Sequence, residues 1–229
     1  YTSLVGSEMC IRDRKKEISI ETKSISNHKA VYDIVRKMRA SILVLGPLLA
    51  REGRAVVSLP GGCAIGARPV DLHLNGLEKM GAKLDLKDGY IYASVQGRLK
   101  GTTYEFPEIS VGATENLIMA ATLAQGTTVL KNAAQEPEIV DLCNCLSEMG
   151  GQIEQLGDGK IVIGGVDSLR GVTHQVLLDR IELGTYMLAP AIAGGSLFLK
   201  RGRRSLLEVF CTKLEEVGIT VKEENHGLI

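Results

Sequence analysis

Apolar and polar positions recur in the same order three times along the chain, with a period of about seventy residues. In each repeat a leucine stands four residues before a glycine at the end of an amphipathic stretch, and the glycines are Gly81, Gly150 and Gly218. Glycine at this place ends a helix, because it adopts the left-handed conformation without strain. The residues after each glycine alternate between apolar and polar, as at 83–86, which predicts a half-buried strand.

A second predicted helix precedes the amphipathic one in each repeat. It is rich in Ala, Leu, Ile and Met, and it covers 41–50, 114–124 and 184–193. A helix that is apolar on all sides is buried, whereas the amphipathic helix carries Glu and Lys on one face and borders solvent. Each repeat is therefore predicted to run strand, helix, strand, helix, strand, strand. Because the apolar helices need cover, we expect an α/β fold in which buried helices are surrounded by sheets.

The composition is that of a globular protein without a dominant charge. The chain has 229 residues and a formal net charge of zero, and 24% of its residues are charged. This length suffices for one or two domains with a core, and the charge balance argues against a general nucleic-acid-binding protein. The dense basic run at 200–204 is either a solvated turn or a phosphate contact. No apolar run approaches the roughly 18 residues of a membrane span, so none is predicted.

The cysteines and histidines show no disulfide or metal-binding pattern. The spacing of the five cysteines fits neither a disulfide framework nor a zinc site, and the four histidines are equally scattered. We therefore expect reduced thiols, a cytoplasmic location and no bound metal. The last three cysteines lie in predicted amphipathic helices and are expected to be packed. The cysteines are Cys10, Cys63, Cys143, Cys145 and Cys211.

The two ends of the chain depart from the repeat. Residues 1–14 lack the basic and apolar regions of a signal peptide and show no periodicity that matches the rest of the chain. We interpret them as a non-native leader. The last residues, 226–229, stop in what reads as the beginning of a strand. The sequence is therefore expected to be truncated at both ends.

One loop combines several chemically useful groups. Residues 59–71 hold Cys63 behind a pair of glycines, and Arg68 follows before a helix that begins near Asp71. Glycines allow positive φ, a guanidinium binds phosphate or carboxylate, and a helix N-terminus attracts anions. A thiol beside such groups has a pKa near or below its free value of about 8.5. The alternative is a buried, inert cysteine in a structural loop.

Five segments together carry a resemblance to a known family. The segments are 37–41, 60–73, 110–116, 132–141 and 179–185. They resemble the UDP-N-acetylglucosamine 1-carboxyvinyltransferases, which are enolpyruvyl transferases, and the likeness covers 15–229. The cysteine loop separates this family from the 5-enolpyruvylshikimate-3-phosphate synthases, which share the fold and the reaction type.

The resemblance implies a fold and a division into domains. The family fold has two domains, each made of three βαβαββ units with buried helices surrounded by sheets, an inside-out α/β barrel. Residues 15–177 are then expected to form most of the catalytic domain, incomplete at its N-terminus, and 178–229 to begin the second domain. The active site is expected between the two domains.

The resemblance also implies a reaction. The enolpyruvyl group of phosphoenolpyruvate moves to the 3′-hydroxyl of UDP-N-acetylglucosamine and phosphate leaves, the first committed step of peptidoglycan precursor synthesis. These two small molecules are the expected partners, without a cofactor, a metal, nucleic acid or a membrane. Cys63 is implied as the general acid that protonates the C3 methylene of phosphoenolpyruvate, and as a covalent site, because a thiol titrates near the working pH. The truncated chain alone is expected to be inactive.

Binding residues carry over from the family position by position. Arg68 is implied to hold a phosphate and Arg39 to contact the sugar nucleotide. Backbone groups of 69–72 are implied to line the uridine pocket, and the hydroxyl and N–H groups of 110–112 to hold the diphosphate. Glu108 stands where some members carry Lys, so no role is carried over to it. The two segments consist of Pro69, Val70, Asp71 and Leu72, and of Ser110, Val111 and Gly112.

Other interpretations stay open at this point. Arg39 could be an ordinary surface residue of a helix, and Ser110 a plain N-cap. The chain could belong to an enolpyruvyl transferase that acts on a shikimate substrate. It could also be a non-enzymatic α/β repeat module whose loop binds a partner.

Overall fold

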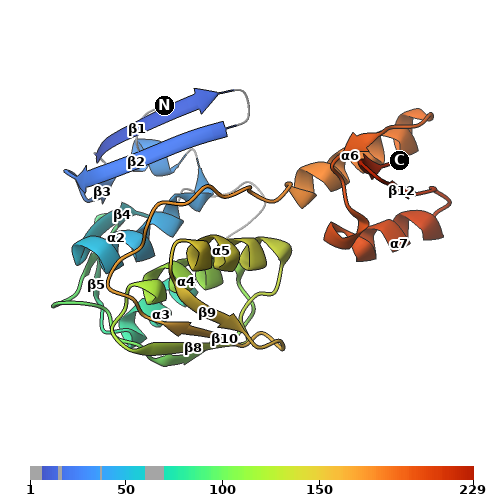
Figure 1. Cartoon of the computed structure of the whole chain (residues 1–229). Helices are drawn as coiled ribbons and strands as arrows, with labels where there is room; N and C mark the ends of the chain where they lie inside the picture. Colours follow the sequence, from blue (N-terminus) through green and yellow to red (C-terminus); the bar gives the residue numbers. More distant parts are fainter. Residues whose placement is uncertain (1–6, 15–16, 37, 60–69) are drawn as a thin grey trace. The chain divides into compact units, whose positions relative to one another are not determined.

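The structure is a computed structural model in which the chain divides into two compact units, Tyr1–His174 and Gln175–Ile229 (Figure 1). The assignment of the two parts of the chain to a catalytic and a second domain stays a prediction. The structure describes residues 7–14, 17–36, 38–59 and 70–229.

The first repeat of unit 1 has the predicted order of elements. Its strands form one sheet in the order β3-β4-β6-β5, in which β3 and β4 are parallel and the other neighbours are antiparallel. The helix predicted over 41–50 differs at its start, because a 3-10 helix, η1, precedes α2. Pro47 lies in the first turn of α2 and has no N–H to donate back into η1. The elements are β3 (Lys29–Ala30), α1 (Tyr32–Val35), η1 (Arg39–Val44), α2 (Leu45–Glu52), β4 (Arg54–Ser58), α3 (Asp71–Lys79), β5 (Lys83–Lys87) and β6 (Tyr90–Ser94).

The second repeat has the same topology as the first. Its sheet order is β7-β8-β10-β9, again with the first two strands parallel and the others antiparallel. The predicted βαβαββ repeat is therefore confirmed in unit 1. The elements are β7 (Thr103–Glu105), α4 (Val111–Thr122), β8 (Thr127–Lys131), α5 (Pro137–Glu148), β9 (Gln152–Gln155) and β10 (Ile161–Gly164).

Helix α4 is the centre of the core of unit 1. It packs against η1, α2, α3, α5 and β10 (Figure 1). Leu117 and Ile118 have no exposed surface. A Cβ on Gly76 of α3 would lie 2.7 Å from Cδ2 of Leu117, so α3 and α4 approach closely at this point. The prediction that this apolar helix is buried is confirmed.

Unit 2 contains a third, shorter copy of the repeat. Its sheet order, β11-β13-β12, corresponds to β4-β6-β5 and β8-β10-β9 in unit 1. No strand precedes α6 within the described residues 165–179. The small core consists of Leu183, Met187, Cys211, Leu214 and Leu228. The elements are α6 (Arg180–Ala193), β11 (Leu199–Lys200), η2 (Arg204–Leu206), α7 (Glu208–Glu216), β12 (Glu223–Glu224) and β13 (Gly227–Leu228).

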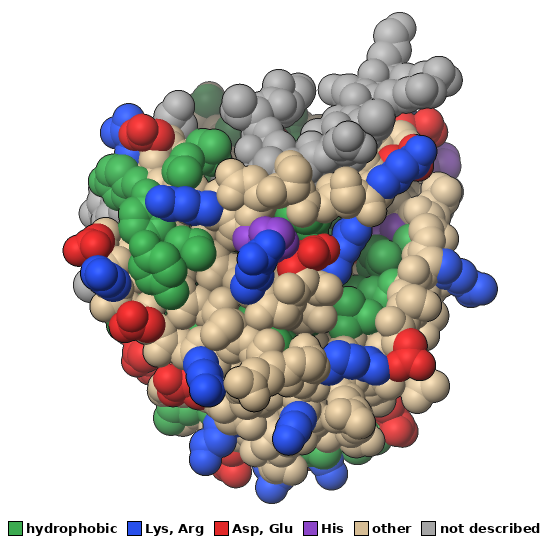
Figure 2. All heavy atoms as spheres, turned by 90° about the vertical axis from the view of Figure 1, so that its left-hand side faces the viewer, with side chains coloured by type: hydrophobic (Ala, Val, Ile, Leu, Met, Phe, Trp, Pro, Cys, Tyr) green, Lys and Arg blue, Asp and Glu red, His purple; other side chains and the backbone are tan. Residues whose placement is uncertain are grey.

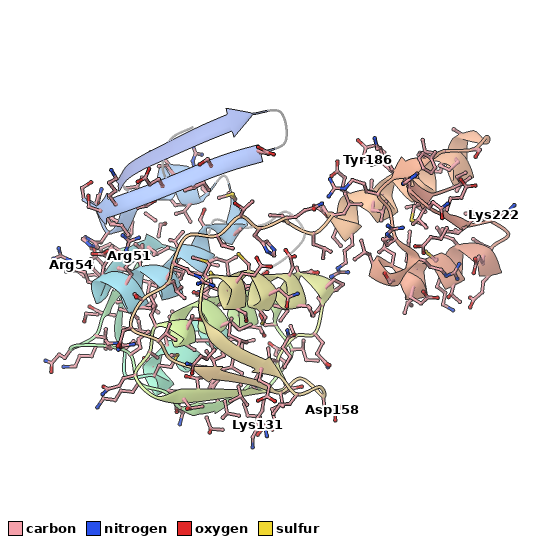
Figure 3. All side chains as sticks on the ribbon, viewed as in Figure 1. Arg51, Arg54, Lys131, Asp158, Tyr186 and Lys222 are labelled. Carbon is pink, nitrogen blue, oxygen red and sulfur yellow. The ribbon has the colours of Figure 1, made fainter. Side chains whose placement is uncertain are left out.

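Helix α6 is not buried as its composition predicts. Ile192 is 86% exposed, Ile181 is 65% exposed, and Tyr186 stands on the outer side of the helix (Figure 3). Only one face of α6, with Leu183 and Met187, packs into the core of unit 2. The expectation of a buried helix at 184–193 is therefore wrong for the structure of this chain, because unit 2 supplies too few elements to cover it.

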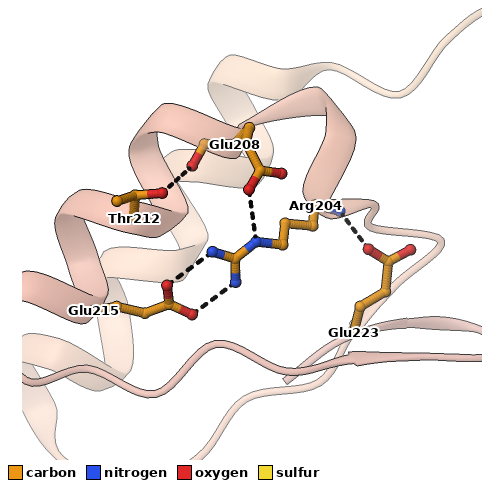
Figure 4. A network of polar contacts seen from close by, with 5 residues as sticks. All are labelled: Arg204, Glu208, Thr212, Glu215 and Glu223. Carbon is orange, nitrogen blue, oxygen red and sulfur yellow. Dashed lines mark hydrogen bonds and ion pairs between the residues drawn. The ribbon is translucent and has the colours of Figure 1, made fainter.

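The basic run at 200–204 ends in an ion-pair network (Figure 4). The guanidinium of Arg204 donates to both carboxylate oxygens of Glu215, at 2.7 and 2.8 Å, and to Glu208 at 3.1 Å. The backbone N–H of Arg204 donates to Glu223 at 2.9 Å. Arg204 lowers the pKa of Glu215, since it stabilises the ionised carboxylate. These carboxylates take three of the five N–H groups of Arg204 and balance its charge, which argues against a phosphate contact at this residue.

The three glycines that mark the repeat end helices as predicted. Each has a positive φ and lies two residues beyond its helix. The residue after each glycine donates its N–H to the carbonyl of the leucine that stands four residues before the glycine. This pattern is the Schellman motif. The φ values are 93° at Gly81, 103° at Gly150 and 91° at Gly218, and the bonds are Ala82 to Leu77 at 3.0 Å, Gly151 to Leu146 at 2.8 Å and Ile219 to Leu214 at 2.9 Å.

A hairpin of β1 (Ser7–Arg14) and β2 (Glu17–Ile25) precedes the first repeat. Arg51 of α2 donates to the backbone carbonyls of Thr22 and Lys23. The interpretation of 1–14 as a non-native leader stays a prediction.

Figure 2 shows one face of the molecule, where side chains of both charges are interspersed. No helix in the described part of the chain has the length and apolar character needed to cross a membrane.

Candidate functional site

The candidate site is built on the starts of helices α3 and α4. Val70 is the N-cap of α3 and Asp71 its first residue, while Ser110 is the N-cap of α4. A Cβ on Gly112 would lie 3.4 Å from Cε1 of His73, which belongs to the first turn of α3. The first turns of the two helices therefore lie against each other. Two of the predicted binding segments are brought together in this way.

The start of α4 offers backbone donors. The hydroxyl oxygen of Ser110 accepts the N–H of Ala113 at 3.3 Å, so Ser110 is an N-cap. The N–H groups of Val111 and Gly112 have no partner inside the helix, because the first turn of an α-helix has no preceding carbonyls. The hydroxyl of Ser110 keeps its own proton for donation to a ligand. Capping and anion binding are thus compatible at this residue.

The start of α3 presents a carboxylate and a buried leucine. Asp71 is exposed, and Leu72 is buried. The carbonyl of Leu72 lies 3.5 Å from the hydroxyl of Tyr104, which donates to it. Burial and then the charge of Asp71 raise the pKa of Tyr104, so its hydroxyl stays protonated. Of these two residues, Asp71 is the one whose side chain reaches solvent.

A buried polar network joins these helices to the η1–α2 junction. Asn116 of α4 has no exposed surface, and His73 is 6% exposed. The amide nitrogen of Asn116 lies 3.0 Å from Nδ1 of His73 and donates to the carbonyl of Ile42 at 3.2 Å. Its oxygen accepts the N–H of Gly46 at 2.7 Å. The sequence interpretation assigned no role to either side chain, although one amide within an apolar helix is a signal for a buried network.

The remaining predicted site residues have no described side chains. Cys63, Arg68 and Pro69 belong to the connection between β4 and α3, which is not among the described residues. Arg39 is placed at the start of η1 by its backbone alone. The assigned roles of these four residues stay predictions.

The EPSP synthase sequence family, described as 3-phosphoshikimate 1-carboxyvinyltransferase, matches residues 4–229. The chain belongs to this family. A relative from Dinoroseobacter shibae is 62% identical over 224 residues, which cover 98% of this chain and 53% of the relative. One from Granulibacter bethesdensis is 58% identical over 205 residues, covering 90% and 49%. Both are named UDP-N-acetylglucosamine 1-carboxyvinyltransferase. The chain spans about half the length of the curated relatives it matches.

Solved structures of enolpyruvyl transferases share the fold. The enolpyruvyl transferase NikO from Streptomyces tendae has a TM-score of 0.83 at 20% identity, over 97% of this chain and 54% of that one. An EPSP synthase from Acinetobacter baumannii has a TM-score of 0.70 at 20% identity, over 96% and 51%. The predicted enolpyruvyl transferase fold is therefore confirmed.

A half-buried carboxylate lies close to the start of helix α4. Burial raises the pKa of Glu115 in α4, and the charges of Glu138 and Glu136 raise it further. Beside it, the hydroxyl oxygen of Thr114 accepts the N–H of Ala134 at 3.1 Å, which ties α4 to the segment before α5. Glu115 therefore holds a proton more readily than an ordinary glutamate.

The described free cysteines are packed, as expected. Cys143 and Cys211 are buried and Cys145 is half-buried. Burial raises the pKa of Cys143 to about 11 and is also the largest cause of the raised pKa values of Cys145 and Cys211. These thiols therefore carry little thiolate at neutral pH. Within the described residues, no three His, Cys, Asp or Glu side chains gather in a way that could hold a metal ion.

Proposed function

We propose that this chain is the nucleotide-binding and thiol-bearing part of a UDP-N-acetylglucosamine 1-carboxyvinyltransferase. The reaction transfers the enolpyruvyl group of phosphoenolpyruvate to the 3′-hydroxyl of the sugar and releases phosphate. The name shared by relatives that are 58–62% identical supports this substrate pair. The structural observation that carries the proposal is the contact between the first turns of α3 and α4.

The sugar nucleotide binds at these two helix starts. The N–H groups of Val111 and Gly112 and the hydroxyl of Ser110 donate to the diphosphate, whose negative charge the N-terminal end of α4 favours. The exposed carboxylate of Asp71 accepts a hydrogen bond from the imide N–H of uracil. Backbone groups of Pro69, Val70 and Leu72 line the uridine pocket, and Arg39 contacts the sugar nucleotide.

Cys63 supplies the proton for the addition step. The sugar 3′-hydroxyl oxygen attacks C2 of phosphoenolpyruvate, while the thiol protonates C3 and Arg68 holds the phosphate. A proton of C3 then returns to the Cys63 thiolate, and phosphate leaves with the proton of the 3′-hydroxyl, which gives the enolpyruvyl ether. Cys63 also adds covalently to phosphoenolpyruvate, with its sulfur on C2 and its proton on C3. The raised pKa values of Cys143, Cys145 and Cys211 argue against these as the acid.

The cellular role follows from the substrates. We infer that the product enters peptidoglycan precursor synthesis, and hence cell-wall biogenesis, cell shape and division. Phosphoenolpyruvate and nucleotide sugars are cytoplasmic metabolites, so the reaction takes place in the cytoplasm.

A chimera tests the proposal. This chain, joined to all the residues of the Dinoroseobacter shibae relative that it does not cover, before and after it, is expected to release phosphate only when both substrates are present. Cys63→Ser removes turnover because a serine hydroxyl is too weak an acid, and Cys63→Asp keeps it because a carboxyl group donates a proton. Cys145→Ser is the matched control and leaves turnover unchanged. Equal turnover in Cys63→Ser and the parent chimera would remove Cys63 from the mechanism.

A second candidate is favoured by the description of the family itself. The family is described by the 3-phosphoshikimate reaction, so shikimate 3-phosphate is the competing acceptor. The same chimera separates the two, because turnover with shikimate 3-phosphate and none with UDP-N-acetylglucosamine would replace the proposed function.

A further inference from the structure

Asn116 joins three helical elements of unit 1 through one buried amide. It lies in the second turn of α4 among apolar neighbours and has no exposed surface. Its oxygen accepts the N–H of Gly46, and its nitrogen donates to the carbonyl of Ile42 and toward Nδ1 of His73. The amide nitrogen has two hydrogens, and both have an acceptor. The packing of α4 alone would be served equally well by an apolar residue of the same size.

The two backbone partners of Asn116 lie on either side of the η1–α2 junction. In an uninterrupted α-helix the carbonyl of Ile42 and the N–H of Gly46 would bond to each other. The amide of Asn116 binds both groups, and these fixed partners determine which end of the amide is oxygen. Because the nitrogen end faces His73, Nδ1 of His73 is an acceptor and the ring proton is on Nε2.

His73 carries the connection to the start of α4. A Cβ on Gly112 would lie 3.4 Å from Cε1 and 3.6 Å from Nε2 of the ring, so the imidazole packs directly against the first turn of α4. His73 itself follows Asp71 and Leu72 in the first turn of α3. The hydrogen bond from Asn116 thus fixes the ring that separates the two helix starts.

We infer that Asn116 is a positioning residue for the sugar-nucleotide site. It sets the first turns of α3 and α4 and the η1–α2 junction at fixed distances, so that the N–H groups of Val111 and Gly112 and the carboxylate of Asp71 face one ligand. This inference rests on the proposed function, because that function assigns the ligand to these helix starts. A ligand whose contacts come from three separate elements is sensitive to small shifts between them.

Binding to this chain tests the inference. Asn116→Asp keeps the oxygen for Gly46 and loses the donor to Ile42 and His73. The Kd for UDP-N-acetylglucosamine, measured by isothermal titration, is expected to rise about tenfold. This rise corresponds to the loss of about one hydrogen bond between the protein and the charged diphosphate. His73→Phe is a second variant that leaves the η1–α2 bonds in place, and it is expected to weaken binding similarly. The control is Thr122→Val on α4, where the hydroxyl bonds only within its own helix, to the carbonyl of Ile118.

A measurement without ligand tests the positioning by Asn116 separately from the identity of the ligand. Amide hydrogen exchange is expected to speed up in the first turns of α3 and α4 in Asn116→Asp, while the second half of α4 keeps its protection. Unchanged Kd and unchanged protection in both variants would overturn the inference. A wild-type chain that does not bind UDP-N-acetylglucosamine would overturn the proposed function, and the exchange pattern would then decide on Asn116 alone. If Thr122→Val raises the Kd by the same factor, Asn116 contributes only to the stability of the core and does not position the site.

Discussion

The contact between Gly76 of α3 and Leu117 of α4 gives a sharp test of the packing that positions the site. A Cβ on Gly76 would lie 3.0 Å from Cγ and 2.7 Å from Cδ2 of Leu117, and closer still to Cδ1. Leu117 has no exposed surface and packs in the main core cluster, so it cannot move away freely. Gly76→Ala is therefore an overpacking substitution in the wild-type chain.

The magnitude follows from two opposing effects. Overpacking costs about 1–3 kcal/mol, whereas replacing a glycine inside a helix by alanine gains about 0.5–1 kcal/mol. The net effect of Gly76→Ala is a loss of about 1–2 kcal/mol in the free energy of unfolding. Leu117→Ala alone removes a fully buried side chain and costs about 2–5 kcal/mol. In the Leu117→Ala background the new methyl group meets a cavity, so Gly76→Ala becomes stabilising by about 0.5–1 kcal/mol.

The assay is a double-mutant cycle by urea unfolding, followed by far-UV circular dichroism. We expect a coupling energy of about 2 kcal/mol between the two positions. Gly171→Ala is the control, because its Cβ would meet nothing within 4 Å, and it is expected to change stability by less than about 0.5 kcal/mol. If Gly76→Ala stabilises the wild-type chain, or if the two changes are additive, α3 and α4 do not approach each other closely at this point.

The titratable groups and the length of the chain give three more tests. Glu115→Gln is expected to raise the melting temperature at pH 7 and to leave it unchanged near pH 4. The raised pKa of Glu115 means that the protonated carboxyl stabilises the folded chain fully below the unfolded pKa, and that this stabilisation is lost as the pH rises through the folded pKa. Melting temperatures measured over a series of pH values check this. Iodoacetamide at pH 7 is expected to label Cys63 before Cys143, Cys145 and Cys211, as read by mass spectrometry of the peptides, and first labelling of Cys143 would contradict it. This chain alone is expected to release no phosphate from the two substrates, because it spans about half the length of its relatives and the proposed mechanism closes two domains over the substrates.

The repeat and its helix ends could be predicted from local chemistry. A leucine four residues before a glycine specifies the Schellman end, since both partners of its hydrogen bond lie within six residues of each other. The same holds for Ser110, whose capping bond reaches only to Ala113. Signals of this kind need no knowledge of the rest of the fold.

The network around Asn116 could not be predicted in the same way. Its partners Gly46 and His73 lie 70 and 43 residues away in the sequence. Nothing local specifies which carbonyl or ring a buried amide will meet, because that depends on how α2, α3 and α4 pack. The break between η1 and α2 is an intermediate case. Pro47 indicates the break in the sequence, but it does not indicate which residue begins the α-helix.

Helices α4 and α6 show why composition alone does not decide burial. Both are mostly apolar, and both occupy the same place in their repeat. Helix α4 is covered because η1, α2, α3, α5 and β10 pack around it, whereas α6 buries Leu183 and Met187 and leaves Ile192 86% exposed. A mostly apolar helix therefore needs neighbouring elements to cover it, and whether it is buried depends on how many repeats surround it. Leu188→Glu on the exposed side of α6 should accordingly cost this chain little stability, while Ile118→Glu on α4 should unfold unit 1.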